Sequence, residues 1–157
     1  MNKPPSVFER VESLLKQRGI TFQVLRHEPV YTSDEASRVL GYVAASGAKA
    51  LICKANDAFV MFVMPGDRKL ASKAVRSAKH WNRLRFATRE EVQELTGLQP
   101  GSIPPFGSLF GLPTLCDERL ADNDVINFNA GDHSVTVSMR LEDYVLAEKP
   151  ELGKFAE

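Results

Sequence analysis

Apolar residues near the amino terminus recur with a helical period. They share one face at Val7, Val11, Leu14 and Leu15. The segment Ser6-Val-Phe-Glu9 has the sequence of a capping box, in which Ser6 and Glu9 satisfy backbone N–H groups at the start of a helix. Gly19 follows the last apolar position and suits a helix end. The pattern therefore predicts an amphipathic helix between Ser6 and Gly19.

Two apolar runs in the middle of the chain are typical of strands. Residues 58–64, Ala-Phe-Val-Met-Phe-Val-Met, carry no charge and alternate poorly, as expected of a strand buried on both faces. The run Ala48-Lys-Ala-Leu-Ile-Cys53 precedes it, and Asn56-Asp57 between the runs suits a hairpin turn. We therefore expect a β-hairpin over residues 48–64.

Further helices and strands are predicted in mixed order. Strands are expected over residues 21–26, 84–87, 125–128 and 134–139. Helices are expected from a second capping box at Thr32-Ser-Asp-Glu35 to Gly41, around residues 70–78, from a third box at Thr88-Arg-Glu-Glu91 to Gly97, and over residues 140–147. This order predicts a single domain over residues 1–157, of α+β or mixed α/β class.

The composition is that of an ordinary globular protein. The chain has 157 residues, of which 43% are hydrophobic and 25% charged. It has no apolar run of about 18 residues and no basic-then-apolar leader, so we expect no membrane insertion, no secretion and a cytoplasmic location. Cys53 and Cys116 fit no metal spacing, and we expect both to be reduced and buried.

Positive charge is concentrated in one segment of a chain whose formal net charge is zero. Between Asp67 and Arg89 the chain has eight lysines or arginines and one acid. Lys69, Lys73, Arg76 and His80 recur at helical spacing and are expected to share one face. One interpretation is a solvated helix face. The other is a small patch for the phosphates of an RNA end.

A segment rich in glycine and proline is the strongest candidate for a binding loop. Residues 97–107 hold three glycines and three prolines. Proline has no N–H, so within 101–107 the available backbone donors are those of Gly101, Ser102, Ile103, Phe106 and Gly107. A rigid loop with a few fixed donors suits an oxyanion or a phosphate. Turn-forming composition alone fits a plain connecting loop equally well.

Lys49 is the second candidate, because it lies where the first strand of the expected hairpin enters the core. Lysine is rarely buried without a partner, so a surface position at the strand end is the alternative. A functional Lys49 would place positive charge beside a phosphate or an ester oxygen.

These two features together resemble the YbaK/prolyl-tRNA-editing family, the free-standing relatives of the editing domain inserted in bacterial prolyl-tRNA synthetase. The family has one lysine in a core strand and a downstream loop of glycine, three residues and proline, which match Lys49 and Gly101-Ser-Ile-Pro-Pro105. The resemblance also covers residues 27–32, 64–69 and 129–137, in the family's order.

The resemblance implies a mixed, mainly antiparallel sheet surrounded by helices. It further implies a trans-acting aminoacyl-tRNA deacylase that removes a small amino acid, on prolyl-acceptor tRNA, and uses no metal or other cofactor. The substrate's own ribose hydroxyl would help to activate water. The implied partner is the acceptor end of tRNA, and an aminoacyl-tRNA synthetase is left open as a second.

The same resemblance assigns site residues. Lys49 and Gly101 would be catalytic. The substrate pocket would comprise His27, Tyr31, Ser102, Ile103, Pro105, Phe106 and His133, with Phe106 and the two prolines narrowing it. The charge pattern, rather than the resemblance, assigns Lys69, Lys73 and Arg76 to the nucleic acid, with a solvated helix face as the alternative.

Other interpretations remain open at this point. We find no Gly-x-Ser-x-Gly elbow and no His-Glu-x-x-His motif. Cys53 and Cys116 are alternative nucleophiles, although neither has a base nearby in the sequence. The alternative functions are a module that binds aminoacyl-tRNA or a synthetase without turnover, and a nucleic-acid-binding protein on the same fold.

Overall fold

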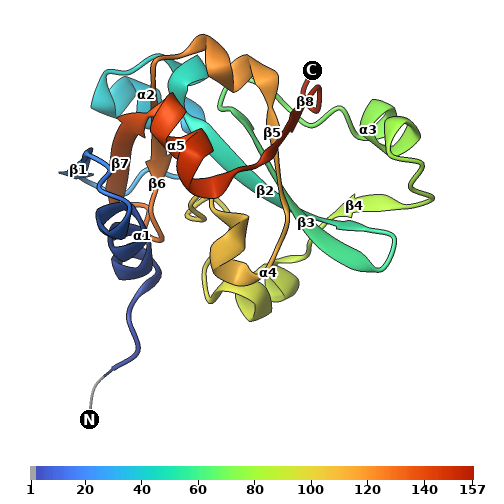
Figure 1. Cartoon of the computed structure of the whole chain (residues 1–157), viewed down its shortest axis with the longest axis horizontal. Coiled ribbons are helices and arrows are strands. Elements are labelled where there is room, and N and C mark those ends of the chain that lie inside the picture. The colour runs from blue at the N-terminus through green and yellow to red at the C-terminus, as the bar shows by residue number, and fades with distance from the viewer. Residues whose placement is uncertain (1–2) are drawn as a thin grey trace.

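The computed structural model describes residues 3–157, whose strands form two sheets (Figure 1). The strands are β1 (Phe22–Arg26), β2 (Ala48–Ala55), β3 (Ala58–Pro65), β4 (Leu84–Phe86), β5 (Thr114–Asp117), β6 (Val125–Asn129), β7 (Val135–Arg140) and β8 (Glu151–Gly153). The helices are α1 (Val7–Gln17), α2 (Ser33–Leu40), α3 (Ser72–Ala78), α4 (Arg89–Thr96) and α5 (Leu141–Glu148), with short 3₁₀ helices at η1 (Ala44–Ser46), η2 (Gly107–Phe110) and η3 (Glu118–Asp122).

The larger sheet has the strand order β4-β2-β3-β5-β8, and the smaller has the order β1-β7-β6. Every pairing is antiparallel except those of β5 with β3 and β8, so the expected mainly antiparallel mixture is confirmed. The strands divide into two sheets, a detail that the sequence did not indicate. The two sheets meet through a single isolated bridge, between Gly47 and Asn127.

The predicted hairpin forms as β2 and β3. It crosses the middle of the molecule (Figure 1). Its register runs from Ala48 opposite Pro65 to Ala55 opposite Ala58. Strand β3 is buried on both faces, because Phe62 belongs to one apolar cluster and Met61 and Val63 belong to another. The two clusters pack on both faces of the hairpin and exclude water from it. This packing makes the start of β2, at Ala48 and Lys49, rigid.

Strands β5 and β8 were not predicted from the sequence. Each is only three or four residues long, so neither shows a readable period, and both pair in parallel with strands distant in sequence. The helix expected around 70–78 begins later, at Ser72. Residues 69–71 instead pair with the carboxyl terminus, where Leu70 forms a bridge with Ala156.

This later start corrects the expected basic helix face. Lys69 lies before α3, and His80 lies after it with a φ of 58°. Only Lys73 and Arg76 of the four basic positions therefore belong to the helix.

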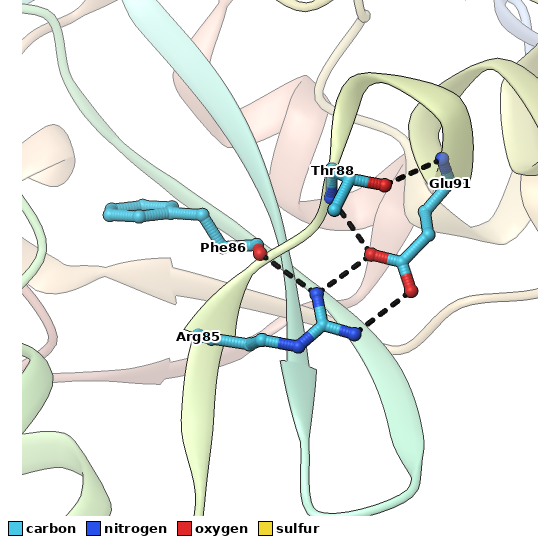
Figure 2. A network of polar contacts seen from close by, with 4 residues as sticks. All are labelled: Arg85, Phe86, Thr88 and Glu91. Atoms are coloured by element: carbon cyan, nitrogen blue, oxygen red, sulfur yellow. Dashed lines mark hydrogen bonds and ion pairs between the residues drawn. The ribbon is translucent and has the colours of Figure 1, made fainter.

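The helix caps are formed by the residues that the sequence indicated. The box at Ser6 is complete, whereas at α2 the described bond is the one in which Thr32 accepts from the Glu35 N–H (3.0 Å). At α4, the Glu91 carboxylate accepts from the Thr88 N–H (2.8 Å) and from both terminal nitrogens of Arg85 (2.7 and 2.9 Å), as Figure 2 shows. The Arg85 bonds, with the cap, lower the pKa of Glu91 to about 2.

Helix α4 ends at Gly97, which has a left-handed φ of 75°, directly before the glycine–proline loop. The cap therefore ties β4 to the helix that leads into the loop. None of the helices in the described part of the chain is both long and apolar enough to cross a membrane.

Candidate active site

A cavity of about 260 Å³ lies between α2, the start of β2, the glycine–proline loop and the end of β6. Its lining comprises Tyr31, Thr32, Ala36, Tyr42, residues 47–51, Gly101, Ile103 and residues 127–129. The structure thus brings Lys49 and Gly101 to one cavity, together with the predicted pocket residues Tyr31 and Ile103. These residues are up to 72 positions apart in the sequence, and only folding joins them.

The backbone donors of the loop divide into two sets. The Ser102 N–H donates to the Gln99 carbonyl (3.2 Å), the Phe106 N–H to the Pro104 carbonyl (2.8 Å), and the Gly107 N–H to Thr114 Oγ1 (3.0 Å). The N–H groups of Gly101 and Ile103 donate to no acceptor among residues 3–157. These two donors belong to the two loop residues that line the cavity. The loop therefore has two backbone N–H groups without a protein acceptor in the described part of the chain, both in residues that line the cavity.

Several bonds hold the loop in this shape. Asn129 Nδ2 donates to the Gly101 carbonyl (2.7 Å), and the Gly131 N–H donates to the Ser102 carbonyl (2.7 Å). The hydroxyl of Tyr144, a fully buried side chain of α5, donates to the Pro105 carbonyl (2.6 Å). The carbonyls of the loop are thus held by the protein, which orients the neighbouring peptide groups.

Gly101 has a φ of 92°, a conformation that L-residues rarely adopt. A Cβ atom at this position would lie 3.2 Å from His133 Cε1 and 3.8 Å from the Tyr31 carbonyl oxygen. Both the backbone angle and the close packing therefore require glycine here.

Lys49 is half-buried at the start of β2, opposite Met64 of β3. Its ammonium group forms no ion pair among residues 3–157. Burial lowers the pKa of Lys49, and the nearby Asp67 carboxylate partly opposes that change. An unpaired, partly desolvated cation in a cavity is typical of a group that meets an anionic ligand.

His133 lies beside the cavity and touches two of its residues. Its ring centroid is 4.6 Å from that of Tyr31, and Gly101 packs against its edge. Among the described residues, His133 Nδ1 is the one buried side-chain nitrogen or oxygen without a hydrogen-bond partner. A buried group left without a partner is costly unless a ligand supplies one.

His27, by contrast, is held by the protein and lies outside the cavity lining. Its Nε2 is 2.8 Å from Thr136 Oγ1, and its Nδ1 is 2.7 Å from the Glu28 carbonyl oxygen. Both ring nitrogens are thus bonded within the fold, and the predicted substrate-binding role of His27 stays a prediction.

Ser102, Pro105 and Phe106 also lie outside the cavity lining, and all three are buried. Phe106 packs between Phe128 and Tyr144, with ring centroids 5.6 and 5.2 Å away. Phe106 therefore lies behind the lining of this cavity, and the predicted narrowing of the pocket stays a prediction. Phe106 supports Phe128, which does line the cavity.

The predicted nucleic-acid residues are not part of this cavity. Lys73 and Arg76 lie on α3, and Lys69 is exposed on the segment before it. In Figure 1, α3 lies at the opposite side of the molecule from α2, which borders the cavity.

Sequence reasoning gave no site role to four polar lining residues: Thr32, Tyr42, Asn127 and Asn129. Asn127 Nδ2 donates to Ser46 Oγ (3.2 Å), and burial raises the pKa of Tyr42, which keeps its phenol protonated. Asn129 opens the closing motif, so its place there was the only available signal. Nothing local distinguishes Tyr42 or Asn127 from structural residues.

The cysteines are free and buried, as predicted. Burial raises the pKa of both thiols to about 12, so neither is a thiolate nucleophile at neutral pH. Within residues 3–157, no three histidines, cysteines or acids gather as metal ligands would.

The family model described as an aminoacyl-tRNA editing domain matches residues 27–146, which include the whole cavity lining. The chain belongs to this family. The resemblance noted in the sequence is therefore confirmed.

Relatives of known sequence extend the match to the whole chain. The Multifunctional Ser/Thr-tRNA deacylase ProXp-y of Escherichia coli K12 is 33% identical over 160 residues, which cover 99% of this chain and 96% of that protein. The proline–tRNA ligase of Bacillus subtilis is 31% identical over 110 residues, which cover 68% of this chain and 20% of the ligase.

Solved structures agree with the fold. A candidate trans-editing enzyme for prolyl tRNA synthetase superposes with a TM-score of 0.85 at 24% identity, over 99% of each chain. The crystal structure of a hypothetical protein superposes with a TM-score of 0.87 at 26% identity, over 95% of this chain and all of the other.

Proposed function

We propose that this protein is a trans-acting aminoacyl-tRNA deacylase, which hydrolyses the ester between an amino acid and the terminal ribose of a mischarged tRNA. One observation carries the proposal. Lys49 lines the same cavity as Gly101 and Ile103, whose backbone N–H groups have no acceptor among the described residues. Family membership and the Ser/Thr-tRNA deacylase of Escherichia coli support the same reaction.

The geometry suits ester hydrolysis. Water attacks the carbonyl carbon, the carbonyl oxygen becomes an oxyanion, and the ribose oxygen leaves with a proton. The N–H groups of Gly101 and Ile103 would stabilise the oxyanion, and known sites lose about 10²–10³ in kcat when one such donor is removed. Lys49 would hold the terminal phosphate or the ester by its charge.

Water activation is assigned to the substrate in this proposal. The cavity lining includes no histidine or carboxylate among the described residues, so it offers no ordinary general base. A ribose hydroxyl next to the ester would orient or deprotonate the water, while the enzyme supplies position and electrostatics.

The proposed substrates are small amino acids on prolyl-acceptor tRNA. The name of the Escherichia coli relative makes seryl and threonyl esters the first to test, with alanyl and cysteinyl esters next. A synthetase partner, a cytoplasmic location and a single domain over residues 1–157 remain predictions.

A deacylation panel tests the function. The purified protein is incubated under single-turnover conditions with prolyl-acceptor tRNA that carries serine, threonine, alanine or proline. The rate of ester loss is compared with the uncatalysed rate. We expect faster hydrolysis of at least one small mischarged ester and little change for Pro-tRNA. Tight binding of every tRNA without turnover would favour the non-catalytic binding module instead.

Selectivity is expected to depend on His133. His133→Ala would remove the ring that packs on Tyr31 and Gly101 and the buried Nδ1 that has no partner in the protein. Because loss of a polar contact shifts discrimination more than loss of one methylene, we expect a higher rate on bulkier or cognate esters relative to the small ester. The measurement is the ratio of these deacylation rates in parent and variant.

His27→Ala provides the matched control for His133. It removes a histidine of the same region whose nitrogens are bonded to Thr136 and Glu28. We expect a lower melting temperature and an unchanged rate ratio. An unchanged ratio in a folded His133→Ala variant would place the selectivity elsewhere.

A further inference from the structure

A second hollow, of about 410 Å³, lies at the turn end of the β2–β3 hairpin, whereas Lys49 lies at its other end. Its lining comprises the cations Lys54, Arg76, Arg83 and Arg85, the acid Asp57, the amides Asn56 and Asn82, and Leu84. We call this hollow the basic cleft. Its residues come from β2 and its turn, from α3, and from β4 and the segment before it, which lie together at one side of the molecule in Figure 1.

Two of the four cations are already paired. Arg85 is held by both oxygens of Glu91 (Figure 2). Arg83 contacts Asp57 at 3.1 Å, but both side chains are largely exposed, so solvent weakens this pair.

The other two cations, Lys54 and Arg76, have no carboxylate partner among residues 3–157. Lys54 Nζ lies over the ring of Phe59, 5.5 Å from its centroid. A smaller hollow adjoins the cleft through Arg76 and Leu84 and adds Lys73. The cleft therefore has an excess of positive charge in a chain whose formal net charge is zero.

The polar groups of the cleft favour an anionic ligand. Asn56 Oδ1 accepts from the N–H groups of Asn82 (3.0 Å) and Arg83 (3.1 Å), which fixes the amide and leaves Nδ2 as its free donor within the described residues. Leu84 is the one apolar residue of the lining, whereas pockets for small organic ligands are mostly apolar. Arginine, lysine and amide donors together suit phosphate oxygens.

We propose that the basic cleft binds backbone phosphates in the acceptor stem of the tRNA whose 3′ end occupies the active site. The proposal rests on the deacylase function. Lys54 lies five residues beyond Lys49 in β2, a backbone spacing of roughly 16 Å at about 3.3 Å per strand residue, and the two side chains leave opposite faces of the strand. That spacing corresponds to about five stacked nucleotides at about 3.4 Å each, counted from the terminal one, so it spans the unpaired 3′ end and reaches the start of the stem. Contacts to phosphates would be independent of base sequence.

The test compares two substrates that share the ester and differ in the stem: a mischarged full-length tRNA and an aminoacylated CCA trinucleotide. The variant Lys54→Glu/Arg76→Glu reverses both unpaired charges. We expect it to raise the KM for the tRNA about tenfold or more, and to reduce the slope of log affinity against log salt by about two. The rate on the trinucleotide should change less than twofold, because the cleft lies outside the active site.

The matched control is Lys3→Glu/Arg18→Glu, which reverses two exposed charges that flank α1 and do not line the cleft. If the KM and the salt slope of the cleft variant equal those of the control variant, the proposal is overturned. An acidic protein is then the alternative partner of the cleft. An equal loss on the trinucleotide would also overturn it. A parent that hydrolyses no ester would refute the deacylase function instead, and affinity for an uncharged RNA hairpin would still test the cleft.

Discussion

Gly101→Ala is expected to lower the single-turnover deacylation rate by about 10²-fold, the typical cost of one lost oxyanion donor. The added methyl group would meet His133 Cε1 at 3.2 Å, and the φ of 92° is unfavourable for alanine. The peptide must rotate to relieve both, and this rotation would redirect the N–H groups of Gly101 and Ile103. The measurement is the rate at saturating enzyme, with circular dichroism to establish folding.

Gly97→Ala separates the catalytic effect from ordinary backbone strain. Gly97 also has a positive φ, of 75°, but a Cβ there has no neighbour within 4 Å. Both variants should lose about 1–2 kcal/mol of stability, the usual cost of a left-handed conformation in an L-residue. Only Gly101→Ala should lose activity. Equal deacylation rates in the two variants would indicate that the glycine–proline loop is only a connecting loop.

Lys49→Ala is expected to lower the rate at least about tenfold, or roughly 1.4 kcal/mol of transition-state stabilisation. Its melting temperature should stay the same or rise. Because burial lowers the pKa of Lys49 in the folded protein, the folded state binds this proton more weakly than the unfolded chain does. The charge of Lys49 therefore opposes folding at neutral pH, and its loss offsets the packing lost with the aliphatic part of the side chain. A folded Lys49→Ala variant with the parent's rate would exclude this role.

The pH dependence provides a second test of Lys49. If its charge accelerates the reaction, the enhancement over the uncatalysed rate should fall as pH rises through the lowered pKa, before an ordinary lysine would titrate. Asp67→Asn removes the carboxylate that partly restores this pKa, so the fall should move to lower pH. Lys49→Arg should keep whatever activity it has over the same range, because arginine stays charged.

The sequence by itself determined the local elements. The boxes at Ser6 and Thr88 each place a hydroxyl and a carboxylate three residues apart, and both form as written. The uncharged run over β3 required burial on both faces, and Asn56 adopted the left-handed turn that joins the hairpin. Such signals depend on interactions between residues close in the chain, so they are readable before folding.

The tertiary structure alone decided which candidate residues lie at the cavity with groups that the fold leaves unused. All five donors of the loop looked equal in the sequence, but Ser102, Phe106 and Gly107 are used by the fold, and only Gly101 and Ile103 remain. His27 and His133 were both assigned to the pocket from the sequence. In the structure, Thr136 is hydrogen-bonded to the ring of His27. Strands β5 and β8 could not be predicted from the sequence either, because they are short and their pairing partners lie far away in the chain. The His27 bond to Thr136 and the strand pairings join residues far apart in the chain. The bonds of Ser102 and Phe106 are local, but they form in a loop that Asn129 and Tyr144 hold in shape, so no local pattern encodes the outcome.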